Sequence, residues 1–445
     1  MSADPAKPSI YPAGSLNANG FTLLNAVAFQ ITLGAPIVLF SKSLGASSTV
    51  IGLVASLTPL LTIFQLPAAQ FLPRFGYKRF MRSGWGLRSI FIYILAAIPV
   101  MGFLDDASKI AVMLVTLFAF NLLRGIASCA WFPWITELIP EDVRGRFLSR
   151  EQFFLQGGCL FALMTSAVVM QGHVDSWDFS MAFLVAAIAQ SFSLFYLDRM
   201  PEVPPSATTE RSSVSVPWRE MVLYSPFLRL LIFNILFMAA IGGLGVFTIE
   251  YLQEIAKLSP SVIMLLSGVS FLAALVGLPF LMRFIDLVSG RILLAASLAM
   301  FAIAITGWFL ISGGVIPSSI VIVAGLTFIA GFAGALFNVA NARIIMSVMP
   351  VMGRNHFFAL FTVITSLGLG ASPITWGLLL DIIGSYEIAG DFFTWKRHSF
   401  YFAAIFAVNL IAFLGVWTLR EGTEVRGDVR LLEARLRRFG RDWAR

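Results

Sequence analysis

The sequence predicts an all-α membrane protein whose twelve transmembrane helices form two six-helix halves related by a parallel repeat. Three observations predict this class. Hydrophobic residues make up 58% of the 445 residues and charged residues 12%, whereas a soluble domain usually carries about 25% charged residues. Apolar runs of about 20 residues, the length that crosses a bilayer, recur along the chain. Short sequence matches recur at a single offset of about 210 residues.

The apolar runs give the predicted helices in order. They are continuously apolar and lack the alternation of transmembrane β-strands, so each is expected to be a helix. The predicted spans are 17–41, 47–72, 80–103, 109–138, 152–172, 178–197, 227–251, 260–282, 291–312, 317–347, 356–382 and 398–419.

The repeat relates the first six spans to the last six. Arg74 closes the second span in the run Phe-Leu-Pro-Arg-Phe, and Arg283 closes the eighth in Phe-Leu-Met-Arg-Phe, 209 residues later. Arg144 and Arg354, which follow the fourth and tenth spans, lie 210 residues apart. Two halves in the same orientation are typical of secondary transporters with a substrate site between the halves, near the bilayer midplane.

Basic residues predict the topology. The loops after spans 2, 4, 6, 8 and 10 are richer in Lys and Arg than the opposite loops, so those loops and both termini are expected to be cytoplasmic. The polar residues before the first span show no cleavable signal peptide. We therefore expect a multi-pass protein of the cell membrane, plasma or bacterial inner. The net charge of +7 reflects this topology and does not indicate nucleic-acid binding.

Composition divides the chain into four parts. Residues 1–199 form the N-terminal half and residues 227–420 the C-terminal half. Residues 200–226, rich in Pro, Ser and Thr, are expected to be a flexible cytoplasmic linker. Residues 421–445 form a basic amphipathic cytoplasmic tail, suited either to an anionic membrane surface or to docking on the protein itself.

Two loop motifs carry a family resemblance. Residues 137–146, with the spacing E-x-x-P-x-x-x-R-G-R, resemble the signature that follows the fourth span in the major facilitator superfamily, especially in its sugar-porter branch. Residues 74–79 resemble the superfamily's loop 2–3 motif, although Pro73 stands where that motif usually has Asp. Span 7 has no Gln pair of the kind that the sugar porters carry, so the branch is not assigned.

The resemblance implies the major facilitator fold and a set of gating residues. In that superfamily, charged residues of these motifs make and break contacts at the cytoplasmic helix ends. The gating residues implied here are Arg74, Lys78, Glu137, Arg144, Arg146, Asp286, Arg291 and Arg354.

Arg124 is the leading candidate for a substrate contact. It lies near the middle of span 4, where a charge is costly and usually functional. We expect it to be the only ionisable side chain near the midplane, with no acidic partner at the same depth. Its guanidinium suits a carboxylate, a phosphate or sugar hydroxyls. The alternative is a structural arginine bound to backbone carbonyls or neighbouring amides. Helical spacing places Asn121, Ser128 and Trp131 on the same face.

Further amides complete the predicted substrate site. The resemblance implies that spans 1, 4, 7 and 10 line the central cavity. The additional lining residues are then Asn25, Gln30, Asn234, Asn338 and Asn341. The alternative for each is an ordinary hydrogen bond between helices.

Together these features predict a secondary active transporter that moves a small polar or anionic solute (a sugar, an organic anion or a drug-like compound) by alternating access. No carboxylate pair, histidine cluster or cysteine pattern indicates an enzyme, a cofactor or a metal site. The protein is expected to be a monomer whose partners are the solute and the bilayer. Coupling to a proton or sodium ion is open, because the acidic residues Glu250, Asp381 and Glu137 lie near span ends and not at the midplane. The alternatives are a facilitative uniporter and a transporter-derived receptor or scaffold.

Overall fold

A computed structural model describes residues 12–203, 222–284, 288–348 and 354–420, which are almost entirely helical. Within these residues, twelve helical segments are long and apolar enough to cross a membrane, as predicted. Their bounds are Asn17–Ser43, Ser48–Ala69, Tyr77–Val100, Asp106–Leu138, Arg146–Val169, Ser176–Asp198, Ser225–Glu254, Pro260–Gly277, Gly290–Ser312, Ile320–Val348, Leu360–Ile383 and Arg397–Thr418. The predicted tail and most of the predicted linker lie outside the described residues.

The chain divides into two compact units, Met1–Pro36 with Phe64–Val214 and Ile37–Ile63 with Ser215–Arg445. We describe each by itself. The repeat places residues 37–63 in the N-terminal half, yet in the structure they belong to the second compact unit. The half boundaries at 199 and 227 stay a prediction.

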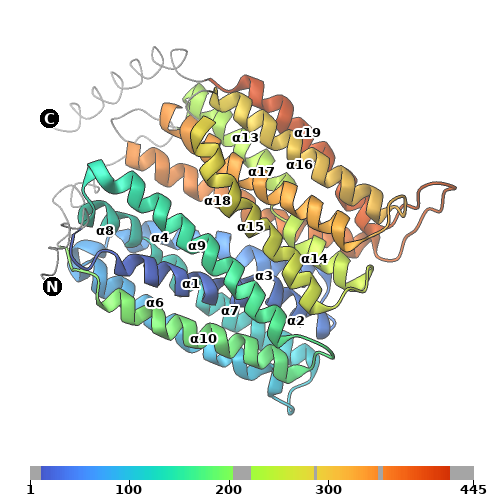
Figure 1. The fold of residues 1–445 in the computed structure, drawn as a ribbon, viewed down its shortest axis with the longest axis horizontal. Coiled ribbons are helices and arrows are strands. Elements are labelled where there is room, and N and C mark those ends of the chain that lie inside the picture. The colour runs from blue at the N-terminus through green and yellow to red at the C-terminus, as the bar shows by residue number, and fades with distance from the viewer. Residues whose placement is uncertain (1–11, 204–221, 285–287, 349–353, 421–445) are drawn as a thin grey trace, which may run out of the picture. The chain divides into compact units, whose positions relative to one another are not determined.

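The first unit is a bundle in which α1 packs against α9 and α10, while α6 packs against α7 and α10 (Figure 1). Pro140 precedes α9, so this helix begins well before the apolar run that it carries. The helices of this unit are α1 (Asn17–Leu33), α4 (Gln65–Ala69), α5 (Leu72–Phe75), α6 (Tyr77–Ala97), α7 (Asp106–Ser128), α8 (Trp131–Leu138), α9 (Glu141–Val169) and α10 (Ser176–Asp198).

The second unit contains most of α2 and all of α3, which packs along α18; α16 and α17 pack together, and α13 contacts both α18 and α19. Its helices are α2 (Ala35–Ser43), α3 (Ser48–Leu61), α13 (Ser225–Ile241), α14 (Leu244–Glu254), α15 (Pro260–Phe284), α16 (Gly290–Ser312), α17 (Ile320–Val348), α18 (Arg354–Ile383) and α19 (Arg397–Gly415).

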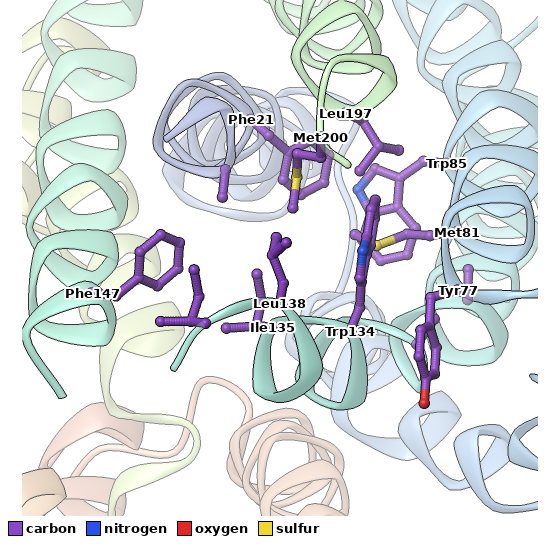
Figure 2. Close-up of a cluster of buried hydrophobic side chains, with 14 of the residues drawn as sticks. Phe21, Tyr77, Met81, Trp85, Trp134, Ile135, Leu138, Phe147, Leu197 and Met200 are labelled. Atoms are coloured by element: carbon purple, nitrogen blue, oxygen red, sulfur yellow. The ribbon is translucent and has the colours of Figure 1, made fainter. Parts of the chain in front are cut away.

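An aromatic cluster holds the end of the first unit together (Figure 2). Phe21 of α1, Trp85 of α6 and Trp134 of α8 are buried in it, and Trp134 Nε1 donates to the Pro201 carbonyl at 3.1 Å. Close packing of such large rings contributes many van der Waals contacts, which together hold helices against one another in a membrane. The cluster therefore fixes α8 against α6 and the end of α10, and with it the position of Trp131 at the start of α8.

Helix breaks occur at equivalent positions of the repeat. Gly34 separates α1 from α2, and Gly242 with Gly243 separates α13 from α14, so that Gly34 and Gly243 lie 209 residues apart. A Cβ at Gly34 would collide with the side chain and carbonyl of Gln30. Discontinuous helices are the form that binding helices take in many transporters.

Candidate functional site

A buried arginine that the sequence analysis did not single out lies at the centre of the first unit. Arg88 is in the middle of α6 and is completely buried. Its Nη2 donates to Oδ1 of Asn25 on α1 and to Oε1 of Gln190 on α10, the latter at 2.6 Å. The guanidinium also lies over the rings of Trp85 and Phe120, 4.4 and 5.0 Å from their centroids.

The described partners of Arg88 are all uncharged. Its Nε and Nη1 are buried and make no hydrogen bond to the described protein atoms. No described carboxylate forms an ion pair with it. Because a buried, unpaired charge is costly, and two aromatic faces offset only about 1–2 kcal/mol each, the positive charge of Arg88 is incompletely compensated.

Arg124, the predicted substrate contact, lies close to Arg88. Phe120, which Arg88 covers, precedes Arg124 by one turn of α7, and the two positive charges interact electrostatically. Arg124 is half-buried, and its guanidinium lies 4.7 Å from the centroid of the Phe29 ring. Among the described residues it makes neither a hydrogen bond nor an ion pair. The donor fork of Arg124 is thus open to an acceptor.

Arg88 corrects one expectation. Arg124 was expected to be the only ionisable side chain near the midplane, but Arg88 also lies in the middle of its span, 11 residues from the start of Tyr77–Val100. The expectation was wrong because mean hydropathy conceals one charge among many apolar residues. The available signal was an arginine inside predicted span 3, one turn after Trp85.

A buried carboxyl group in the first unit was also missed. Glu151 of α9 is 8% exposed, and its Oε1 accepts hydrogen bonds from Trp131 Nε1 at 2.9 Å and from Thr22 Oγ1 at 3.3 Å. Predicted span 5 begins at residue 152, which left Glu151 in a loop, whereas α9 begins at Glu141. A helix start after Pro140 was the sequence signal that places Glu151 inside the bundle.

The other predicted residues of span 4 lie partly as expected. Asn121 is buried on α7, and its Nδ2 donates to the Leu117 carbonyl at 2.9 Å. Ser128 Oγ donates to the Gly125 carbonyl at 3.1 Å. Because α7 ends at Ser128 and α8 begins at Trp131, Trp131 does not continue the face of α7 as an unbroken helix would require. Gln30, on α1, is half-buried beside Gly34.

In the second unit, two predicted lining residues bind each other. Asn234 Nδ2 donates to Asn341 Oδ1 at 3.2 Å, and Asn341 Nδ2 donates to Asn234 Oδ1 at 2.7 Å. Both side chains are buried. This reciprocal pair joins α13 to α17 and agrees with the alternative of an interhelical hydrogen bond. Asn338, one turn earlier on α17, is exposed.

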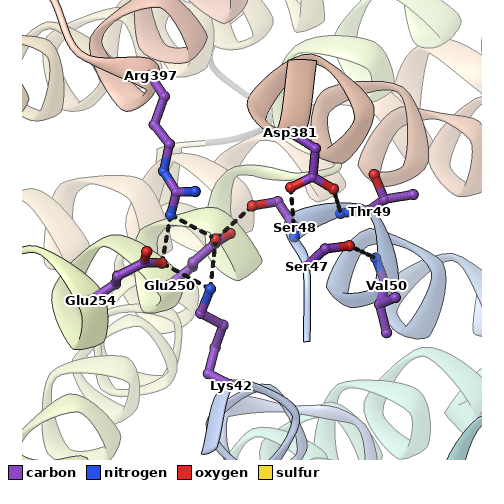
Figure 3. A network of polar contacts seen from close by, with 9 residues as sticks. All are labelled: Lys42, Ser47, Ser48, Thr49, Val50, Glu250, Glu254, Asp381 and Arg397. Atoms are coloured by element: carbon purple, nitrogen blue, oxygen red, sulfur yellow. Dashed lines mark hydrogen bonds and ion pairs between the residues drawn. The ribbon is translucent and has the colours of Figure 1, made fainter. Parts of the chain in front are cut away.

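A charged cluster lies at one end of the second unit (Figure 3). Glu250 is completely buried, and its Oε1 is 3.2 Å from both Lys42 Nζ and Arg397 Nη2. Glu254 binds the same two cations at 2.8 and 2.5 Å, and Ser48 Oγ donates to Glu250 at 2.6 Å. We call Lys42, Glu250, Glu254 and Arg397 the Glu250 cluster. Its two acids and two bases are balanced in charge.

Asp381 of α18 binds the start of α3 beside this cluster (Figure 3). Its carboxylate accepts from the backbone N–H groups of Ser48 at 3.0 Å and Thr49 at 2.8 Å. A carboxylate at a helix N-terminus satisfies unpaired N–H groups and interacts favourably with the helix dipole. Asp381 and the Glu250 cluster therefore attach α3 to α14, α18 and α19.

Three predicted gating residues bind carbonyls near helix ends. Lys78 Nζ donates to the Asp198 and Met200 carbonyls at 2.8 and 2.9 Å. Arg144 Nη2 donates to Thr136 and Ile139 carbonyls at 2.8 and 3.1 Å, and Arg291 Nη1 donates to the Leu419 carbonyl at 3.2 Å. A cation at a helix C-terminus satisfies otherwise unpaired carbonyls.

The remaining gating residues are less constrained. Within the described part of the chain, no ion pair joins Glu137 to Arg144 or Arg146. Arg74, Glu137 and Arg146 are exposed, whereas Asp286 and the side chain of Arg354 lie outside the described residues. Nor do the described residues contain a group of three His, Cys, Asp or Glu side chains that could hold a metal ion.

Comparison with known proteins identifies the family. The family model described as Major Facilitator Superfamily matches residues 18–258 and 230–441. The inward-open xylose transporter XylE from E. coli has a TM-score of 0.69 at 15% identity over 94% of this chain and 98% of that chain. A D-xylose-proton symporter gives 0.70 at 17% identity over 91% and 97%, and the nucleoside transporter NupG gives 0.67 at 13% over 91% and 99%. At these identities the likeness concerns the fold alone.

A curated relative matches over a shorter stretch. The major myo-inositol transporter IolT of Bacillus subtilis (strain 168) is 25% identical over 133 residues, which are 29% of this chain and 28% of the relative. The chain thus matches less than a third of that relative's length. The family-model matches, in contrast, cover both halves of the predicted repeat. The chain therefore belongs to the Major Facilitator Superfamily, a family of membrane transporters rather than enzymes.

Proposed function

We propose that this protein is a secondary active transporter that moves a polyhydroxylated organic anion, such as a sugar acid, by alternating access. One observation carries the proposal. Arg88 and Arg124 lie close together in the middle of the first unit, and neither forms an ion pair with a described carboxylate.

The arrangement suits an anion for electrostatic reasons. Two positive charges in a region of low dielectric constant attract an anion and repel a cation, and each interaction is several times stronger there than in water. Arg124 is half-buried with an open donor fork, so it is the residue proposed to bind the carboxylate directly. Arg88 is completely buried and adds a positive potential.

Neutral groups nearby suit the hydroxyls of the same solute. Asn121 and Ser128 lie within one turn of Arg124 on α7, and Gln30 lies one residue after Phe29, which Arg124 covers. Amide and hydroxyl side chains both donate and accept hydrogen bonds, as sugar hydroxyls do. Asn25, predicted as a lining residue, is proposed instead to hold Arg88 in place through its hydrogen bond.

The proposal includes the predicted topology and gating. Both termini and the basic loops are cytoplasmic in it, and the protein works as a monomer. Lys78, Arg144 and Arg291 hold helix ends through carbonyl contacts. Loss of such contacts is therefore expected to slow the change between conformations more than it weakens solute binding.

A neutral polyol is the second candidate solute. It is favoured by the partial sequence match to a myo-inositol transporter. A guanidinium also donates to sugar hydroxyls, but a neutral solute leaves the charges of Arg88 and Arg124 without a counter-charge.

Three solutes that share the same sugar ring but differ in charge distinguish the anion from the neutral polyol. We propose uptake into proteoliposomes of labelled D-glucuronate, D-glucose and D-glucosamine, with labelled myo-inositol as a fourth solute and protein-free liposomes as control. The proposal predicts uptake of D-glucuronate well above that of D-glucose and none of D-glucosamine. Uptake of D-glucose or myo-inositol without D-glucuronate would favour the neutral polyol. Equal uptake of D-glucosamine and D-glucuronate would contradict the argument that the two arginines attract an anion and repel a cation.

A further inference from the structure

We infer that Glu151 is a proton-binding site of the transport cycle, so that solute movement is coupled to a proton. The identity of the solute rests on the function proposed above, whereas the proton-binding role of Glu151 rests on its own surroundings. The sequence analysis did not consider Glu151 as a functional residue, because predicted span 5 begins one residue after it.

Glu151 is buried between neutral hydrogen-bond donors. Its Oε1 accepts from Trp131 Nε1 at 2.9 Å and from Thr22 Oγ1 at 3.3 Å, and only 8% of the residue is exposed. Among the described residues no cation lies within ion-pair distance of it. The carboxyl group is therefore buried without a counter-charge.

Among the described side chains, none of the charged groups on the elements around Glu151 lies within ion-pair distance of it. Helix α1, which packs along α9, carries no ionisable side chain. The acidic residue of α8, Glu137, is exposed, and on α9 the guanidinium of Arg150 lies over the Phe154 ring at 5.7 Å. At the end of α10, Asp198 forms an ion pair with Arg82 at 2.7 Å. Burial and the two hydrogen bonds thus define the surroundings of Glu151 among the described residues.

The two kinds of interaction act in opposite directions. Burial without a counter-charge favours the neutral acid over the carboxylate. Two donated hydrogen bonds favour the carboxylate, by about 1.5–3 kcal/mol for a bond to a charged group. A group held between these effects can accept a proton from water in one conformation and release it in another, if the conformations differ in exposure or in these two contacts.

Glu151 is connected through its partners to the arginine pair. Thr22 precedes Asn25 by one turn of α1, and Asn25 holds Arg88. Trp131 follows the break that ends α7, the helix of Arg124, and its ring packs 5.1 Å from Phe21 of α1. A shift of α1 or of the break between α7 and α8 would alter both the arginine pair and the contacts of Glu151. One proton taken up with one monovalent anion would make the transported pair electrically neutral.

The first test needs no solute. Infrared difference spectra of the reconstituted protein between acidic and alkaline pH should contain, besides the bands of the exposed acids, a distinct C=O band of a buried protonated carboxyl that is absent from Glu151→Gln and present in Glu387→Gln. The control makes the same chemical change at a half-exposed carboxylate, 3.6 Å from Lys396. Trp131→Phe keeps Glu151 but removes one donor, so the titration midpoint of the band should rise by about one to two pH units. If the band is unchanged in Glu151→Gln, the inference is wrong. If Glu151→Gln fails to fold, an unshifted titration midpoint in Trp131→Phe would overturn the inference instead.

The second test joins the proton to transport. Proteoliposomes that contain a pH-sensitive dye should acidify internally when D-glucuronate is added outside. Glu151→Gln should lose this acidification, to the level of protein-free liposomes, but retain exchange of labelled D-glucuronate for unlabelled D-glucuronate. Acidification by Glu151→Gln at the normal rate would contradict the inference. If the infrared band titrates as predicted but D-glucuronate is not transported, the proposed solute fails and the proton site stands.

Discussion

Replacement of Glu250 by Gln tests the energetic role of the charged cluster in the second unit. Glu250 is completely buried, and Lys42 and Arg397 are 14% and 17% exposed. At 3.2 Å and an effective dielectric constant of 20, each ion pair is worth about 5 kcal/mol. Glu250→Gln removes two such pairs and also the desolvation cost of the carboxylate, which is several kcal/mol.

The expected net loss is about 3–5 kcal/mol of unfolding free energy, the range for breaking a buried pair. Glu254 still binds both cations, at 2.8 and 2.5 Å, so the lower end of this range is expected. Charge balance offers a further check. Arg397→Gln in the Glu250→Gln background leaves one cation with one anion and should restore about 1–3 kcal/mol.

The assay is reversible unfolding in mixed micelles of increasing denaturing-detergent content, followed by circular dichroism. The matched control is Glu387→Gln, whose partner Lys396 is 3.6 Å away and about half exposed. An exposed pair of this kind is worth about 0–1 kcal/mol. If Glu250→Gln and Glu387→Gln lower the unfolding free energy equally, burial does not determine the strength of this cluster and the reasoning fails.

Three other predictions concern topology, gating and the amide pair. Single cysteines at Ser212 and Ser259, in a background without the native cysteines, should label from opposite sides of the membrane; labelling from one side would contradict the twelve-span topology. Arg144→Ala should lower turnover several-fold while D-glucuronate affinity stays within about twofold, because Arg144 binds carbonyls near the end of α8. Asn234→Leu should lower the unfolding free energy by about 1–3 kcal/mol, because it removes the amide partner of Asn341. The double variant Asn234→Leu with Asn341→Leu should recover part of this loss. A double variant that is less stable than Asn234→Leu would argue against the pair.

The helices could be predicted from the sequence because their signal is local. A run of apolar residues that must satisfy its own backbone in lipid becomes a helix wherever it lies. Span 7, for example, was predicted at 227–251 and is observed at Ser225–Glu254. Its interruption at Gly242 and Gly243 was not predicted, because a glycine gives the same local signal in a continuous helix as in a broken one.

The contacts of the site could be predicted only in part. Sequence placed Asn234 and Asn341 on spans 7 and 10, but it did not predict that they bind each other, because pairing depends on how two helices are rotated. The burial of Arg88 depends on Gln190, which is 102 residues away along the chain. Glu151 was lost to an error of span boundary, since α9 begins eleven residues before the predicted start at 152.

Binding of labelled D-glucuronate to Arg124 variants tests the central proposal most directly. The measurement compares the dissociation constant of the purified, reconstituted protein with those of Arg124→Lys and Arg124→Gln. Because charge-assisted hydrogen bonds are worth about 1.5–3 kcal/mol, Arg124→Gln should weaken binding by about 10- to 100-fold or more, and Arg124→Lys, which keeps the charge but loses the fork, by less. Equal affinity of Arg124→Gln and the unaltered protein would show that Arg124 is structural and would contradict the proposed anion site.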